Sequence, residues 1–203
     1  MEPGVVSVEG VEVLFTEEQI RDRVRALGEA ITADYAGRAP VLISVLKGGT
    51  VFLADLLRRI HLPVRIDFMS ISQYEEDARA SGVVRIVKDL DQDIGDEDVV
   101  VVEDIIDTGL TLSYLLTSLW SRAPRSLEVC TLLDKSVRRI APLEIRYTGF
   151  DCPDAFVVGY GLDLQERYRN LPFIVSLPRE RLADADPDLL LPYLAAPGQG
   201  RGE

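Results

Sequence analysis

Residues 99–111 combine side chains and a turn that together can bind a sugar phosphate. The segment reads VVVVEDIIDTGLT, in which an apolar run leads into the adjacent acids Glu103 and Asp104. Two apolar residues later comes the run Asp107, Thr108, Gly109, Leu110 and Thr111. Acids are costly in a buried strand unless they have partners. At the carboxyl end of a parallel strand, however, they face the crevice where open α/β sheets bind ligands.

The turn at residues 107–111 precedes a predicted helix. A helix N-terminus offers unpaired backbone N–H groups and the positive end of the helix dipole, which together favour a phosphate group. Carboxylates beside such a turn can hold sugar hydroxyls, so the combination suits a ribose 5-phosphate. The alternative from these residues alone is an ordinary buried strand followed by a capped helix.

The elements that position this segment alternate along the chain. We expect strands at 41–46, 64–72, 83–90, 99–106, 127–134 and 155–161, and helices at 16–36, 50–60 and 112–122. The first helix has a capping box at Thr16 and Gln19, followed by an apolar stripe with helical spacing. Such alternation predicts an α/β fold with a mainly parallel central sheet flanked by helices.

Composition narrows the class of protein. The 203 residues carry a net charge of −12, without the basic stripe that nucleic-acid binding requires. No apolar run approaches the ~20 residues needed to span a bilayer, and the N-terminus does not resemble a signal peptide. Two cysteines do not make a disulfide framework. We therefore expect a cytoplasmic protein that binds neither nucleic acid nor membrane.

Only three of the 22 basic residues are lysines, Lys47, Lys88 and Lys135. A GC-rich genome explains such a bias. In a chain that otherwise uses arginine, a lysine can also mark a place where a compact ammonium group is needed.

The 99–111 segment closely resembles the signature with which type I phosphoribosyltransferases bind 5-phosphoribosyl 1-diphosphate (PRPP). The resemblance extends over residues 10–178 and is strongest for the bacterial hypoxanthine-guanine phosphoribosyltransferases. It implies transfer of the phosphoribosyl group to hypoxanthine or guanine, giving IMP or GMP, with Mg²⁺. It also implies one domain over 1–183, with a small hood built from the N-terminal segment and residues 156–178. Residues 184–203 would be a partly disordered extension.

The resemblance assigns roles within the signature. Glu103 and Asp104 would fix the ribose hydroxyls and share in holding Mg²⁺. Asp107 would be the catalytic general base for the purine N7 proton. The 5′-phosphate would be held by Asp107, Thr108, Gly109, Leu110 and Thr111. Leu110 stands where some relatives carry a basic residue, so backbone groups must do more of the binding.

Leu46, Lys47 and Gly48 resemble the loop that binds diphosphate in this family. There a cis peptide bond between the leucine and the lysine exposes backbone amides to the diphosphate. Arg169 matches the arginine that reaches the same group.

The purine site is implied by three further segments. Lys135 would donate to O6 of a 6-oxopurine, which excludes adenine. Phe156 would stack on the base, and Val157 would offer backbone groups to its Watson–Crick edge. Asp163 would hold a Mg²⁺ ion that also touches the diphosphate.

A mobile loop over 73–82, beginning at Gln73 and Tyr74, would close over the site. The family usually has serine before this tyrosine, and three acids follow here at 75–77, so the details of closure stay open.

Several alternatives remain at this stage. One is a xanthine-preferring enzyme, another a nucleotide-sensing regulator with the same fold, and a third a catalytically idle paralogue. Asp134 and the pair Arg138 and Arg139 either tune the purine site or are solvated loop charges. By analogy with the family we expect a homodimer or homotetramer.

Overall fold

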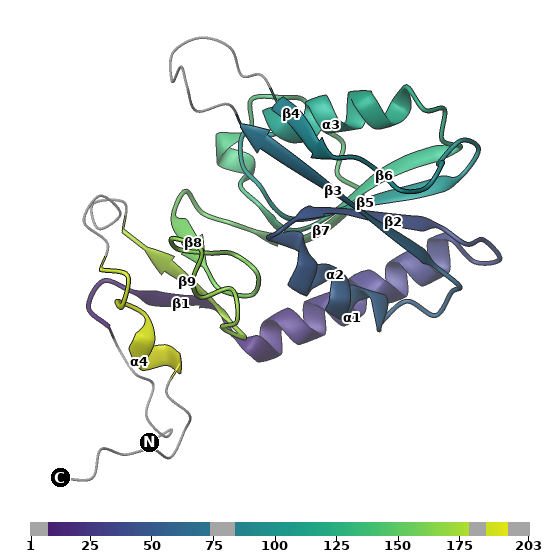
Figure 1. Cartoon of the computed structure of the whole chain (residues 1–203). Coiled ribbons are helices and arrows are strands. Elements are labelled where there is room, and N and C mark those ends of the chain that lie inside the picture. Colours follow the sequence, from purple (N-terminus) through teal and green to yellow (C-terminus); the bar gives the residue numbers. More distant parts are fainter. Residues whose placement is uncertain (1–7, 74–83, 179–185, 195–203) are drawn as a thin grey trace. The chain divides into compact units, whose positions relative to one another are not determined.

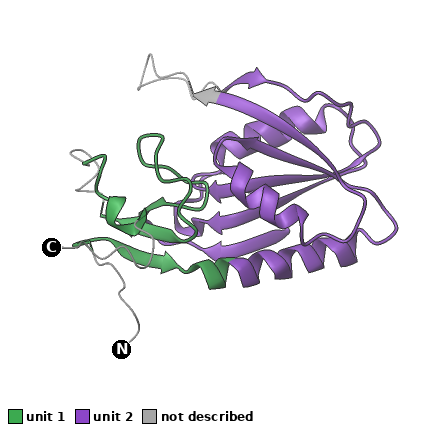
Figure 2. Ribbon diagram, turned by 60° about the horizontal axis from the view of Figure 1, so that its bottom comes forward, with its two compact units in different colours: residues 1–20, 155–203 green, residues 21–154 purple. Residues whose placement is uncertain are grey.

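The computed structural model describes residues 8–73, 84–178 and 186–194. The chain divides into two compact units (Figure 2). Unit 1 comprises residues 1–20 and 155–203, and unit 2 comprises residues 21–154. Among the described residues, no helix is long and apolar enough to cross a membrane.

Unit 2 is built on a six-stranded sheet with the order β4-β3-β2-β5-β6-β7 (Figure 1). The strands are β2 (Val41–Leu46), β3 (Arg65–Gln73), β4 (Val84–Lys88), β5 (Asp98–Ile106), β6 (Ser126–Asp134) and β7 (Tyr147–Asp151). Only the β3–β4 pair is antiparallel. The helices are α1 (Glu17–Asp34), whose first residues fall in unit 1, α2 (Gly49–Leu57), α3 (Leu110–Trp120) and the 3₁₀ turn η2 (Ser136–Arg138). The predicted α/β fold with a mainly parallel sheet is confirmed.

The two faces of β5 pack against different helices. Val99 and Val101 share a buried cluster with Leu112 and Leu115 of α3. On the other face, a Cβ added to Gly49 at the start of α2 would overlap Ser44 Oγ and lie 3.3 Å from the carbonyl oxygen of Val102. Successive side chains of a strand alternate between faces. Val99 and Val101 of β5 therefore face α3, and the start of α2 packs against the other face of the sheet.

Helix α1 forms for the reasons its sequence suggests. The N–H of Thr16 donates to Gln19 Oε1 (2.8 Å), and the N–H of Gln19 donates to Thr16 Oγ1 (3.2 Å). This reciprocal pair is the predicted capping box. The predicted apolar stripe is buried at every position: Ile20, Val24, Leu27, Ile31 and Tyr35.

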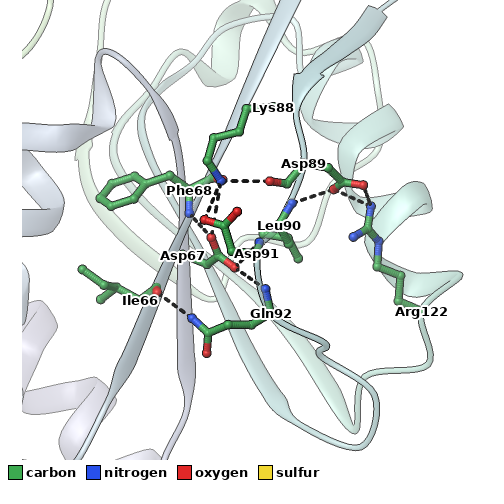
Figure 3. Close-up of polar contacts among 9 residues, drawn as sticks. All are labelled: Ile66, Asp67, Phe68, Lys88, Asp89, Leu90, Asp91, Gln92 and Arg122. Atoms are coloured by element: carbon green, nitrogen blue, oxygen red, sulfur yellow. Dashed lines mark hydrogen bonds and ion pairs between the residues drawn. The ribbon is translucent and has the colours of Figure 1, made fainter.

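The antiparallel edge strand β4 is fixed to β3 and to the following loop by a polar network around Asp67 (Figure 3). Asp67 is buried, and its Oδ2 accepts hydrogen bonds from the N–H groups of Asp91 (2.9 Å) and Gln92 (3.0 Å). Its Oδ1 accepts one from the N–H of Phe68 (2.7 Å). Lys88 Nζ donates to the carbonyl of Phe68 and to the Asp91 carboxylate, both at 3.0 Å. A compact ammonium group suits this crowded position.

Unit 1 contains a three-stranded antiparallel sheet with the order β1-β9-β8, made of β1 (Glu12–Phe15), β8 (Phe156–Val158) and β9 (Ile174–Leu177). Its core includes Val158, Val175 and Leu190, all fully buried. Leu190 immediately precedes the short helix α4 (Leu191–Leu194). Residues 186–194 of the expected C-terminal extension thus contribute to the unit 1 core, while the remainder of that extension lies outside the described residues.

Three sequence predictions of secondary structure need correction. The strand expected over 155–161 ends at Val158. Gly159, Tyr160 and Gly161 then all have positive φ (104°, 50° and 100°), which no extended strand tolerates. Helix α3 begins two residues earlier than expected, at Leu110. The short strands β1, β7 and β9 were not predicted.

Candidate active site

A pocket of about 280 Å³ lies at the carboxyl end of β5 in unit 2. Its wall combines the end of β5, the following turn and the first residues of α3 with one residue each from β2 and β3. The lining residues are Val45, Ile71, Glu103, Ile105, Ile106, Asp107, Thr108, Gly109, Thr111 and Leu112. The structure thus gathers in one hollow four of the five residues of the predicted phosphate turn, together with the first predicted ribose acid.

The turn predicted at residues 107–111 leads into the N-terminus of α3. Gly109 has φ +79° and precedes the helix, whose first backbone bond runs from Ser113 N–H to the Gly109 carbonyl (2.9 Å). The Thr108 carbonyl accepts hydrogen bonds from the N–H groups of Ile140 (2.9 Å) and Ala141 (3.1 Å). The N-terminus of a helix favours an anion through its first N–H groups and the positive end of its dipole, and here the Leu110 N–H lies 3.5 Å from Thr108 Oγ1.

Gly109 is closely packed on its other side. A Cβ there would lie 2.7 Å from Leu143 Cδ1 and 2.9 Å from Arg139 Nη1. Arg139 pairs through Nη2 with Asp134, while its buried Nη1 has no hydrogen-bond partner among the described residues. Arg139 and Leu143 therefore pack against Gly109 and help to hold the turn in place.

Glu103 projects to the α3 face of β5 and lines the pocket. Burial, and after it the negative charge of Asp104, raise the pKa of the Glu103 carboxyl well above its ordinary value. Within the described part of the chain, no cation offsets these two effects. A cationic ligand or a hydroxyl-rich sugar in the pocket would supply the missing stabilisation.

Asp104 projects to the opposite face, beside the turn that precedes α2. A Cβ added to Gly48 would overlap the Asp104 carboxylate, so glycine allows this side chain to lie directly against the turn. The Leu46–Lys47 peptide bond is cis, as the family resemblance implied. The predicted diphosphate loop and one predicted ribose acid therefore lie in contact, whereas Glu103 lies on the other side of the sheet.

Asp107 makes an ion pair that sequence reasoning missed. Arg138 Nε donates to Asp107 Oδ1 at 2.6 Å, and Arg138 Nη1 lies 3.2 Å from Asp154 Oδ1. The hydrogen bond from Arg138 to Asp107 is the main cause that raises the pKa of this guanidinium. The only signal in the sequence was the Arg138–Arg139 pair close to Lys135, which left the partner undetermined.

Lys135 follows β6 at the same edge of the sheet. Its N–H donates to the carbonyl of Ile106 (2.9 Å), the residue before Asp107, and the side chain is largely buried. The predicted purine-reading lysine and the predicted base are thus on adjacent strand ends.

Unit 1 holds the other predicted residues. Asp163 Oδ1 lies 2.8 Å from Arg169 Nη2, and Arg169 Nη1 donates to the Gly161 carbonyl (2.8 Å). Phe156 and Val157 lie on β8, an edge strand of the small sheet. The outer side of an edge strand presents backbone groups outside the ladder, which is what a base edge requires.

The predicted mobile loop is only partly described. Gln73 is the last residue of β3, and Tyr74 lies outside the described residues, as do the acids at 75–77.

Comparison with known proteins is consistent with this arrangement. Residues 10–165 match the family model of the phosphoribosyl transferase domain. The chain belongs to this family. Among curated phosphoribosyltransferases, the hypoxanthine-guanine phosphoribosyltransferase of Mycobacterium tuberculosis (strain ATCC 25618 / H37Rv) is 53% identical over 171 residues, covering 81% of this chain and 85% of that protein. The enzyme of the same name from Bacillus subtilis (strain 168) is 47% identical over 163 residues, covering 80% and 91%.

Solved structures of the family are similar to this chain in fold and in sequence. A crystal structure of a hypoxanthine phosphoribosyltransferase from Staphylococcus aureus superposes with a TM-score of 0.81 at 46% identity, covering 87% of this chain and 98% of that one. At such identity the likeness extends beyond the fold to the sequence.

Proposed function

We propose that this phosphoribosyltransferase works in purine salvage, joining hypoxanthine or guanine to PRPP to give IMP or GMP and diphosphate. The observation that carries the proposal is the pocket at the end of β5, where a phosphate-binding turn and carboxylates surround one hollow. The names of the relatives favour this function over a xanthine-preferring enzyme or a nucleotide-sensing regulator.

The ribose phosphate occupies the pocket at the start of α3. N–H groups of the turn, from Asp107 through Thr108, Gly109, Leu110 and Thr111, bind the 5′-phosphate without a basic side chain in the turn itself. Glu103, which lines the pocket, and Asp104, beside the turn that precedes α2, orient the 2′ and 3′ hydroxyls. Fixing the ring in this way aligns C1 for attack.

The diphosphate leaves from C1 as the purine N9 attacks. Leu46, Lys47 and Gly48 bind the leaving group through the turn before α2, and Arg169 adds a guanidinium. Negative charge grows on the diphosphate as the bond breaks, so fixed cations and amides stabilise the transition state more than the ground state.

Magnesium fits the available donors. Mg²⁺ is commonly held by one or two carboxylates together with substrate phosphates and water. Glu103, Asp104 and Asp163 offer such oxygens, and no cluster of three or more metal-binding side chains occurs in the described ranges. The ion would neutralise charge on the diphosphate.

The purine is read from two directions. Lys135 donates to O6, Phe156 stacks on the ring, and Val157 backbone groups bind the Watson–Crick edge. Asp107 handles the proton at N7. Adenine carries an amino group in place of O6 and leaves the Lys135 ammonium without an acceptor, which makes it a poor substrate.

The resemblance to the family also supports proposals about the hood, the mobile loop, the location and the assembly of the enzyme. Residues 156–178 with the N-terminal segment form a hood within one domain of 1–183, and the loop from Gln73 and Tyr74 closes over bound substrates. The enzyme acts in the cytoplasm as a homodimer or homotetramer.

A turnover assay with PRPP and Mg²⁺ tests the proposal. Hypoxanthine and guanine should both be converted, xanthine poorly and adenine not at all. Efficient formation of AMP would remove Lys135 from its role, and no turnover with any of the four bases would overturn the proposed function.

A further inference from the structure

We propose that Arg138 is a positioning residue for the reaction, which holds the Asp107 carboxylate in the orientation needed at purine N7. The inference rests on the proposed function, because it takes Asp107 as the proton-handling group. It starts from a contact that the sequence did not reveal, the ion pair between these two side chains.

The geometry of the contact leaves half of the carboxylate for substrate. Arg138 Nε donates to Asp107 Oδ1 at 2.6 Å. Asp107 is nearly half exposed (46%), so without a partner its side chain would sample several rotamers. A carboxylate has acceptor sites on both oxygens. The ion pair engages Oδ1, and Oδ2 remains for the base.

Arg138 itself is held firmly. Its Nη1 lies 3.2 Å from Asp154 Oδ1, and its N–H donates to the Lys135 carbonyl at 2.9 Å. Asp107 is therefore connected, through one guanidinium, to two backbone segments that follow neighbouring strands. The planar Arg138 guanidinium, which contacts both Asp107 and Asp154, restricts the orientation of the Asp107 carboxylate more than a single point charge would.

The segment that carries Arg138 is also tied to its neighbour. Ser136 Oγ donates to Asp151 Oδ1 (2.7 Å), and the Cys152 N–H donates to the Asp134 carbonyl (2.8 Å). The connection after β6 and the residues that follow β7 thus form one hydrogen-bonded platform. Lys135, the proposed O6 reader, belongs to the same platform, which fixes the lysine and the aspartate relative to each other.

The test uses steady-state kinetics on the full chain with five variants, of which the single Asp107→Asn variant is the reference for the double variant. Arg138→Ala removes the contact, and Arg138→Lys keeps the charge without the fork. The double variant Arg138→Ala/Asp107→Asn asks whether Arg138 acts through Asp107. The control is Arg122→Ala, since Arg122 is similarly exposed (27% against 32%) and pairs with Asp89 at 2.7 Å, and neither of these two residues lines the pocket.

We expect Arg138→Ala to lower kcat about 10- to 100-fold, as misplacement of a reacting group does, with KM for PRPP changed less than about threefold. Arg138→Lys should recover kcat to within about fivefold of wild type. In the Asp107→Asn background, loss of Arg138 should cost less than about twofold more, because residues that act as a unit are not additive. Arg122→Ala should keep kcat.

Each of the following results for Arg138→Ala would overturn the inference: an unchanged kcat, an equal loss of kcat in both backgrounds, a rise in KM alone, or a kcat above that of wild type. A loss of melting temperature matched by Arg122→Ala, with kcat unchanged in both, would reduce Arg138 to a surface ion pair. An inactive wild type would count instead against the proposed function.

Discussion

Two carboxylates of unit 2 lie in contrasting surroundings: Asp67 is buried, whereas Glu103 is partly buried and lines the pocket. Asp67, between β3 and the loop after β4, accepts three backbone hydrogen bonds and lies 3.8 Å from Lys88 Nζ (Figure 3). Glu103, at the end of β5, has a strongly raised pKa because burial and Asp104 both oppose its charge.

The difference distinguishes a carboxylate that stabilises the fold from one that is available to bind a ligand. A buried carboxylate whose acceptor sites are filled holds backbone segments together, and its network is complete without a ligand. A carboxylate that faces a pocket without compensation destabilises the free protein, and a ligand that supplies the missing partner binds more tightly for that reason. Asp67 belongs to the first kind, whereas Glu103 belongs to the second.

The largest expected effect is on turnover, from substitution of Asp107 in the proposed active site. Asp107→Asn should lower kcat by ~10²–10⁴-fold and leave PRPP affinity nearly unchanged, because the amide keeps the shape but cannot take the N7 proton. Single-turnover kinetics with an equilibrium measurement of PRPP binding would check this. Turnover equal to that of wild type would remove Asp107 from the chemistry.

The second prediction concerns Asp67, whose substitution should affect stability and not turnover. Asp67→Ala leaves the backbone N–H groups of Phe68, Asp91 and Gln92 without their carboxylate acceptor and removes the ion pair with Lys88, and should lower the free energy of unfolding by about 2–4 kcal/mol. Urea unfolding would measure it. At a temperature where the variant is folded, kcat should stay within about twofold of wild type. A stable variant with impaired turnover would reverse the distinction between the two carboxylates.

A smaller effect, of opposite sign in stability, is expected at Glu103. Because the folded pKa is raised, the unfolded chain ionises first as the pH rises above the ordinary value of 4.5, and the wild type loses stability over that interval. Glutamine cannot ionise. Glu103→Gln should therefore melt ~2–4 °C higher than wild type at pH 7.5 in metal-free buffer, with the difference vanishing near pH 4.

Calorimetry at the two pH values would check the Glu103 prediction, and PRPP affinity should fall in the same variant. A lower melting temperature for Glu103→Gln at pH 7.5 would show that Glu103 already has a stabilising partner in the ligand-free protein.

Much of unit 2 could be predicted from the sequence. The run at 99–102 is apolar on both faces, which is typical of a buried parallel strand, and the α1 stripe follows a helical period from Ile20 to Tyr35. The phosphate turn was also predictable, since Gly109 and the threonines around it lie between such a strand and a helix.

Unit 1 was harder to predict for a physical reason. Its strands have three or four residues, too few to show a period, and β1 pairs with β9 more than 150 residues away in the sequence. The partner of Asp107 was hidden in a similar way. Arg138 lies 31 residues further along the chain, and no local pattern reveals which carboxylate an exposed arginine binds.

The central claim, that the turn at the start of α3 binds the 5′-phosphate, is tested most directly by a crystal structure with IMP bound. We predict the phosphate oxygens at 2.7–3.2 Å from backbone nitrogens of residues 108–111, with the ribose hydroxyls within reach of Glu103 in the same pocket. A bound nucleotide whose phosphate lies elsewhere, with this turn empty, would contradict the claim.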